Sequence, residues 1–359
     1  MKSGVLATMA TMAVMGATLL AGCGTPAATN TSAHGSKINI LETGSTLLFP
    51  LFSKWVPSYE SSHHNVSITP AGTGSGTGIA QALAGSVQIG ASDAYMSSSQ
   101  MKPGILNIPL AISAQVVAYN LPGLNGRHLN LSGRILAGIY TGHITSWDDP
   151  EIAAANPGVV LPHHAIIPIR RSDASGDSFL FTSYLTDTAP TLWNAGFSTS
   201  PNWPAVSGEV SEDGNGGMVD GLKANPYSLA YVGISYLNSM ESDNLGYAAL
   251  QDKSGQYVLP LASNITRAAS AMVSHTPADE RVSLIDAPGS DAYPIINYEY
   301  AIVQSHQTSG STAAALKTFM RWAISSSGGS APAFLKTVHF LPLPASVVRL
   351  SLNQIHAIH

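Results

Sequence analysis

The stretch RRSDASGDSFLF, residues 170–181, gathers side chains that can hold an anion. Its two arginines can donate parallel hydrogen bonds to the oxygens of an anion, and its two aspartates can pair with those arginines. Ser175 and Gly176 stand just before an apolar run, where a helix would begin and its first N–H groups would lack partners. The stretch therefore predicts an anion site, with a salt-bridged surface turn as the alternative.

Two further stretches repeat this design of a strand end, small hydroxyl and glycine residues, and a helix: ETGSTLLF at 42–49 and AGTGSGTGIAQ at 71–81. Helix N-termini carry partial positive charge, glycine lets the backbone approach a bound group, and hydroxyls add donors. One such helix start is ordinary capping, but three in one chain favour an oxyanion site. A nucleotide site is not favoured, because GTGSGTG lacks both a following Gly-Lys-Ser/Thr and the G-x-G-x-x-G spacing.

These loops need an α/β framework to position them. Short apolar runs and helical spacing alternate from Lys37 onward, in a β-α-β-α-β order that is typical of an open α/β sheet. Strands are predicted at 37–44, 65–72, 86–94, 165–170, 227–235 and 293–304, and helices at 46–60, 78–85, 132–142, 148–156 and 311–325. A second unit begins near 114–124, and residues 241–292 support no prediction.

Composition limits the possible partners. The 359 residues are 45% hydrophobic but only 10% charged, with a formal net charge of −5, whereas about 25% charged residues is typical. No basic run of five or more residues occurs, which predicts that nucleic acid is not a partner. The length suggests more than one lobe. An acidic chain can still bind an anion, because local donors decide that.

The N-terminus predicts export and a lipid anchor. Lys2 precedes an apolar run at 5–20, which indicates a signal peptide at 1–22. The run ends in LAGC and resembles the lipobox of bacterial lipoproteins, which implies cleavage before Cys23, lipidation of that residue, and a flexible tether at 23–36. Cys23 is the only cysteine, so no disulfide can form within the chain. The alternative is a membrane helix, for which the run is short. We expect an extracytoplasmic protein anchored to the cell membrane.

Five stretches, in this order, resemble periplasmic phosphate-binding proteins, the solute receptors of the high-affinity phosphate ABC transporter: TGSTLLFPLFSKW, AGTGSGTGIAQALAGSVQIGASDAYMS, YTGHITSWDDPEIAAANPG, IRRSDASGDSFLFTSYL and AYPII. The resemblance implies a two-lobed α/β periplasmic-binding-protein fold, each lobe a mixed sheet flanked by helices, with the ligand in the cleft. It implies lobe I at 37–115 plus 295–359 and lobe II at 116–294. The implied partners of this monomer are inorganic phosphate and the transporter's membrane permease.

The resemblance also implies which residues bind phosphate: Thr46, the backbone amide of Leu47 (where the family has phenylalanine), Ser75, Asp93, Arg171, Ser175, Gly176 and residue 177, with Asp173 pairing with Arg171. An ionised Asp93 would accept from the P–O–H group of monohydrogen phosphate and repel sulfate; the alternative is a helix cap. The family usually has threonine at position 177. Asp177 therefore either turns outward to cap the helix or faces the ligand.

Other functions stay open at this level. GDSF at 176–179 resembles the start of a GDS-type esterase motif with Ser178 as nucleophile, but no D-x-x-H pair occurs in the last hundred residues. The remaining alternatives are a receptor for another oxyanion and a phosphate sensor without a transporter. The histidines lie in polar stretches or at the C-terminal end, with no cysteine or carboxylate at ligand spacing, so we predict no metal and no cofactor. We expect a binding protein and not an enzyme.

Overall fold

The structure is a computed structural model and describes residues 37–359. The predicted signal peptide at 1–22, Cys23 and the tether at 23–36 lie outside the described residues. Within residues 37–359, no helix has the length and apolar character needed to cross a membrane.

A nine-stranded mixed sheet forms the centre of the fold. Its strands follow the order β2-β1-β3-β12-β4-β8-β6-β7, with β9 beside β4. Their bounds are β1 Ile38–Gly44, β2 Val66–Thr69, β3 Ile89–Ser92, β4 Ile105–Asn120, β6 Ile167–Arg171, β7 Val210–Glu212, β8 Ser228–Gly233, β9 Gly246–Tyr247 and β12 Ile296–Gln304. A three-stranded sheet joins β5 (Asn130–Leu131), β10 (Ala249–Gln251) and β11 (Tyr257–Val258).

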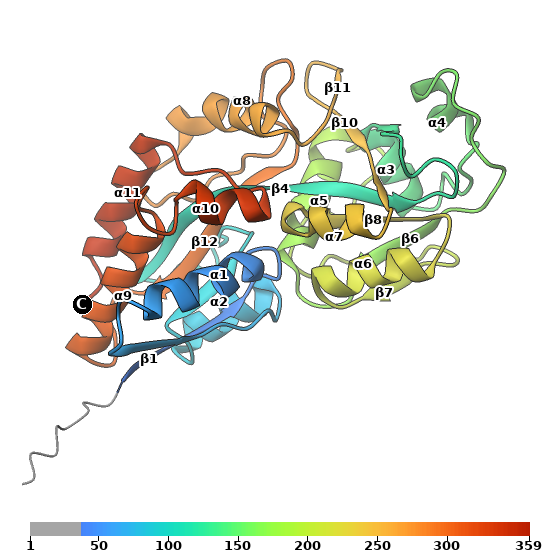
Figure 1. The fold of residues 1–359 in the computed structure, drawn as a ribbon. Helices are drawn as coiled ribbons and strands as arrows, with labels where there is room; N and C mark the ends of the chain where they lie inside the picture. The colour runs from blue at the N-terminus through green and yellow to red at the C-terminus, as the bar shows by residue number, and fades with distance from the viewer. Residues whose placement is uncertain (1–36) are drawn as a thin grey trace, which may run out of the picture. The chain divides into compact units, whose positions relative to one another are not determined.

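The long strand β4 links the two halves of the central sheet. It pairs with β12 along Ile105–Ala114 and with β8 along Gln115–Asn120, both antiparallel. Figure 1 shows β4 running from the helices α9 and α11 toward α5 and α6. The strand begins well before the predicted boundary near 114, because its residues are buried on both faces and so show no period-2 alternation. The boundary predicted near 114 instead coincides with the point at which β4 changes its pairing partner from β12 to β8.

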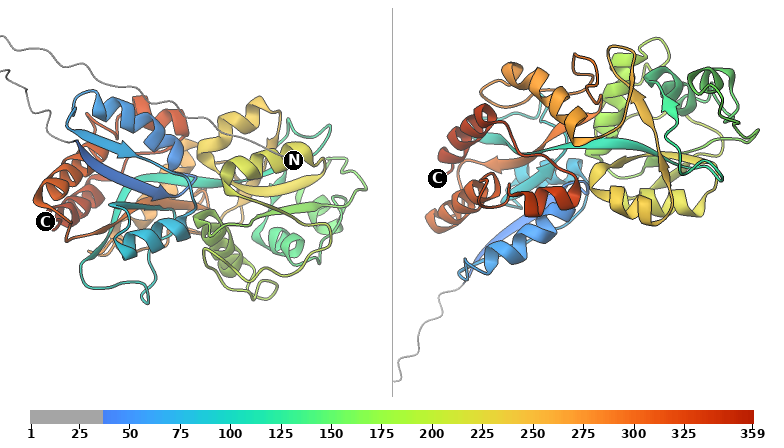
Figure 2. Two further views of the ribbon diagram at one scale, coloured as in Figure 1. Left: turned by 90° about the horizontal axis from the view of Figure 1, so that it is seen from below. Right: turned by 45° about the horizontal axis from the view of Figure 1, so that its top comes forward.

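Helices cover the sheet, and segments from both ends of the described chain build one part of it. β1 packs against α9, and both views in Figure 2 place the blue N-terminal elements beside the red C-terminal helices. The helices are α1 Phe49–Glu60, α2 Ser75–Ala84, α3 Gly133–Tyr140, α4 Pro150–Ala155, α5 Gly176–Thr188, α6 Gly214–Ala224, α7 Leu237–Ser242, α8 Ala262–Met272, α9 Gly310–Ala323, α10 Pro332–Leu335 and α11 Ala345–His356.

Glycines bring α2 close to the ends of β1 and β3. A Cβ atom on Gly78 would lie 2.5 Å from the carbonyl oxygen of Ala91, and one on Gly90 would lie 2.2 Å from the carbonyl oxygen of Gly78. Only residues without side chains allow this approach. The helix also begins three residues earlier than predicted, at Ser75. The first turn of α2 is thereby held beside the residues that follow β3.

Candidate anion-binding site

Arg171 ends strand β6 and lies at the centre of a buried polar cluster. Its Nε donates to Asp173 Oδ1 at 2.6 Å and its Nη2 to Asp173 Oδ2 at 2.5 Å, while its Nη1 donates to Asp177 Oδ2 at 2.9 Å. The residue is only 3% exposed. These three bonds use three of the five N–H groups of the guanidinium, so two remain for another acceptor.

Asp177 points into the cluster, so of the two alternatives the outward helix cap is wrong. The side chain is buried, and besides Arg171 it accepts from Asn215 Nδ2 at 2.6 Å and from Gln115 Nε2 at 3.1 Å. The capping role belongs to Ser175, whose hydroxyl accepts from the backbone N–H of Ser178 at 3.2 Å. Donors from three separate segments hold the Asp177 carboxylate. Their hydrogen bonds are stronger than the interaction that this carboxylate would have with the N-terminal N–H groups of α5.

Asp93 follows β3 and is also buried. It accepts hydrogen bonds from the hydroxyls of Ser45 and Ser75, the second at 3.2 Å, and its own backbone N–H donates to Ser75 Oγ at 3.1 Å. No helix begins at this position, so the alternative of a helix cap is wrong. Burial, together with the nearby charge of Asp177, raises the pKa of Asp93 to about 7.

A second carboxyl lies behind Asp93. Glu299 on β12 is fully buried and accepts from Ser113 Oγ at 2.5 Å and from Asn297 Nδ2 at 3.0 Å, whereas its Oε2 has no partner within residues 37–359. Burial and the charge of Asp93 raise the pKa of Glu299 well above its ordinary value. Both effects disfavour the ionised form of Glu299.

The loop after β1 reaches the N-terminus of α6. Thr46 Oγ1 accepts from the backbone N–H of Asn215 at 3.1 Å and from Asn215 Nδ2 at 3.0 Å. The carbonyl of Leu47 accepts from Ser235 Oγ at 2.8 Å. Because the Thr46 hydroxyl acts only as an acceptor in these two bonds, its own proton stays available for a bound group.

Gly176 lies where no side chain fits. A Cβ atom there would come within 2.3 Å of Asp93 Oδ2 and 2.4 Å of Ser75 Oγ. The first turn of α5 thus packs directly against the first turn of α2 and the end of β3. Three of the predicted site residues, Gly176, Ser75 and Asp93, therefore lie next to one another.

Sequence reasoning missed four members of the cluster: Ser45, Gln115, Asn215 and Glu299. Asn215 had a readable signal, because EDGNGG at 212–217 is another strand end followed by glycine and a helix, with Ser211 preceding it. Ser45 adjoins the predicted Thr46. Gln115 and Glu299 stand inside apolar strands, where the sequence gives no sign that their side chains face a site.

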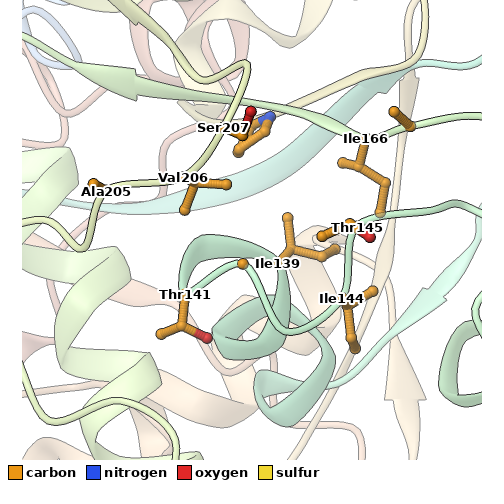
Figure 3. Close-up of a pocket in the computed structure, with 11 residues that line it drawn as sticks. Ile139, Thr141, Ile144, Thr145, Ile166, Ala205, Val206 and Ser207 are labelled. Atoms are coloured by element: carbon orange, nitrogen blue, oxygen red, sulfur yellow. The ribbon is translucent and has the colours of Figure 1, made fainter.

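A separate pocket lies elsewhere on the molecule (Figure 3). It has a volume of about 400 Å³ and shares no residue with the Arg171 cluster. Its lining has no charged side chain and consists of Ile139, Thr141, Gly142, Ile144, Thr145, Ala165, Ile166, Pro168, Ala205, Val206 and Ser207. It offers no cation to an anionic ligand.

The fold and the buried cluster define a solute-binding protein of the periplasmic type, and residues 26–327 match the model of the PBP superfamily domain. The chain is 33% identical over 345 residues to the phosphate-binding protein PstS of Methanocaldococcus jannaschii, covering 90% of this chain and 87% of that protein. It is 32% identical over 314 residues to PstS of Xylella fastidiosa, covering 87% and 83%. The chain belongs to this PstS family of phosphate-binding proteins.

Solved structures agree with the predicted fold class. A phosphate-binding protein from Stenotrophomonas maltophilia superposes with a TM-score of 0.68 at 18% identity, covering 88% of this chain and 94% of that one. The prediction of an α/β periplasmic-binding-protein fold is therefore confirmed.

The family and the structure also decide against the esterase alternative. PstS proteins are binding proteins, so the prediction of a non-enzyme is confirmed. The hydroxyl of Ser178 is buried within α5 and contacts the hydroxyl of Tyr231 at 2.7 Å, and not a histidine. Within residues 37–359, no histidine or carboxylate accepts a hydrogen bond from the Ser178 hydroxyl, so no general base there activates it.

Proposed function

We propose that the mature protein binds one inorganic phosphate ion at the Arg171 cluster and delivers it to the membrane permease of a phosphate ABC transporter. The observation that carries this proposal is the buried guanidinium of Arg171 with two N–H groups still available. The N-termini of α2, α5 and α6 converge on the same place and add partial positive charge. Membership of the PstS family supports phosphate as the anion.

The proposed ligands combine donors with one acceptor for a P–O–H group. They are Thr46, the Leu47 amide, Ser75, Asp93, Arg171, Ser175, Gly176 and Asp177, with Asp173 as the positioning residue for Arg171. The hydroxyls of Thr46 and Ser175 act as acceptors in their protein hydrogen bonds, which leaves their protons for phosphate oxygens. Asp93 would accept from a P–O–H group, which sulfate lacks, and this is the proposed basis of selectivity.

We further propose lobe I at 37–115 plus 295–359 and lobe II at 116–294, with phosphate between them. The change of partner of β4 at Gln115 supports this boundary. It would place Thr46, Ser75 and Asp93 on one lobe and Arg171 and Ser175 on the other. Closure of the lobes would then complete the site.

Calorimetric titration of the purified mature protein with phosphate, sulfate and arsenate tests the proposal. We expect one phosphate per chain and no comparable binding of sulfate. A receptor for another oxyanion would bind sulfate at least as well as phosphate. Either that result or the absence of any phosphate heat would overturn the proposed function.

Substitution of Gly176 by alanine is expected to weaken phosphate binding by roughly 5- to 150-fold. The added methyl group would overlap Asp93 and Ser75, and such overpacking costs about 1–3 kcal/mol. Titration of Gly176→Ala measures the effect. Gly216→Ala in α6 is the matched control, because a Cβ atom there meets nothing within 4 Å. Unchanged affinity in Gly176→Ala would show that this close approach is not needed for binding.

We propose that Cys23 anchors the protein to the cell membrane through a lipid, as the LAGC stretch indicates. Replacing Cys23 with alanine is expected to move the protein from the membrane to the soluble fraction of cells that express the full chain. Ser32→Ala, in the same tether, should stay with the membrane. If Cys23→Ala remains bound as strongly as the native chain, the apolar segment is itself the anchor.

A further inference from the structure

The charge of Arg171 is shared between two carboxylates before any ligand arrives. Asp173 takes the Nε side of the guanidinium and Asp177 takes Nη1. Asp93 adds a third carboxyl, close enough for the charge of Asp177 to raise its pKa. Among these groups there is a single cation, so a doubly charged phosphate would enter a site that already carries net negative charge.

One of the residues that hold Asp177 keeps a buried acceptor without a donor. The two amides that hold its carboxylate come from Gln115 and Asn215, both buried. The other side-chain atom of that glutamine, Gln115 Oε1, is buried and has no partner within residues 37–359. A buried acceptor without a donor is costly, so this site is best completed by a ligand that brings hydrogen-bond donors.

We propose that Asp177 makes this site selective for dihydrogen phosphate, the singly charged form that carries two P–O–H groups. The inference rests on the proposed function of phosphate binding and specifies which form of phosphate is bound. A threonine at position 177 would donate to a phosphate oxygen, whereas an aspartate accepts. Asp93 and Asp177 then accept from the two P–O–H groups, and Arg171, Thr46 and Ser175 donate to the other oxygens. The phosphate complex with Asp177 therefore holds one more proton than the phosphate complex of a protein with threonine at position 177.

Few groups around Asp177 can change protonation between about pH 5 and pH 8. The titratable and charged groups that face it are Arg171, Asp173, Asp93, Tyr231 on β8 and Tyr236 of the 3₁₀ turn Ile234–Tyr236, with Glu299 behind Asp93. Burial raises the pKa of both tyrosines, so they stay neutral in this range. The extra proton in the phosphate complex of the native protein, compared with that of a threonine variant, therefore resides on phosphate or on a carboxyl.

The test is calorimetric titration with phosphate from about pH 8 to about pH 5, with the native protein and Asp177→Thr. We expect the affinity of the native protein, relative to the variant, to rise by up to about tenfold per pH unit as pH falls, as linkage to one proton requires. Titrations at about pH 8 in two buffers of different ionisation enthalpy count protons directly. The native protein should take up about one more proton per phosphate than Asp177→Thr.

Two further variants make the result specific. Asp177→Asn keeps the shape of the side chain but removes its charge, so it should lose the same proton linkage. Glu209→Gln removes a carboxylate that pairs with Arg170 at 2.9 Å, outside the site, and should follow the native curve. Parallel affinity curves and equal proton uptake in the native protein and both Asp177 variants would overturn the inference while leaving phosphate binding intact. No phosphate heat in any protein would overturn the proposed function instead.

Discussion

Replacing Arg171 with alanine is expected to lower the affinity for phosphate by roughly 10²- to 10⁴-fold. Two N–H groups of its guanidinium are available to the ligand, and each hydrogen bond to a charged group contributes about 1.5–3 kcal/mol. The substitution also leaves Asp177 buried without its cation, which adds electrostatic repulsion against an incoming anion.

Titration calorimetry measures this loss, with thermal unfolding as the check that each variant is folded. Arg171→Lys keeps the positive charge but not the planar fork, and should fall between the native protein and Arg171→Ala. The matched control is Arg170→Ala, because this neighbouring arginine pairs with Glu209 and its side chain is 26% exposed. A folded Arg171→Ala protein that binds phosphate within about tenfold of native affinity would remove Arg171 from the centre of the proposed site.

The parts of the fold with regular patterns could be predicted from the sequence, and the parts without them could not. Alternation and helical spacing predicted the strands and helices between Lys37 and Ser92, and Gly85 ends α2 in the left-handed conformation that favours glycine. Strand β4 was placed too late because burial on both faces removes the alternation. Residues 241–292 hold strands of two or three residues, too short to carry any periodicity, and also the 11-residue helix α8, which the sequence reasoning missed.

In the candidate site, the orientation of a side chain could not be predicted where its partners lie far away in the sequence. The resemblance to phosphate-binding proteins implied that Asp173 pairs with Arg171, and the two side chains are in contact in the structure. The direction of Asp177 depends on Gln115 and Asn215, which are 62 and 38 residues away in the chain. No local rule predicts such partners, and the usual preference of helix starts for acidic residues pointed to the opposite orientation.

A second large effect is expected on stability: the protein should become more stable as pH falls from about 8 to about 5. Glu280 is fully buried, and its carboxylate oxygens accept from Ser351 Oγ at 2.8 Å and from Gln354 Nε2 at 2.5 Å, both on α11. Burial raises the pKa of Glu280 to about 8. Burial also raises the pKa of six other carboxyls: Glu42, Asp93, Asp177, Asp187, Asp286 and Glu299.

The direction of this pH effect follows from the number of protons that the folded and the unfolded states bind. In the unfolded chain Glu280 would titrate near its ordinary pKa of about 4.3, whereas the folded protein keeps that proton until about pH 8. The folded state therefore binds more protons between these values. The stabilisation is fully present below the unfolded pKa and is lost as pH rises through the folded pKa. For Glu280 alone, the difference between about pH 5 and pH 8 is on the order of 3 kcal/mol.

Thermal and denaturant unfolding across this pH range, with phosphate absent, measures the effect. The native protein should gain roughly 5–10 °C in midpoint at the acidic end from Glu280 alone. Glu280→Gln cannot ionise, so its stability should depend less on pH by that amount. Glu151→Gln, which alters an exposed ion pair with Arg134, should keep the native dependence. A native protein that loses stability on acidification, or a Glu280→Gln curve parallel to the native one, would show that Glu280 is ionised in the fold, with its charge stabilised by the α11 donors.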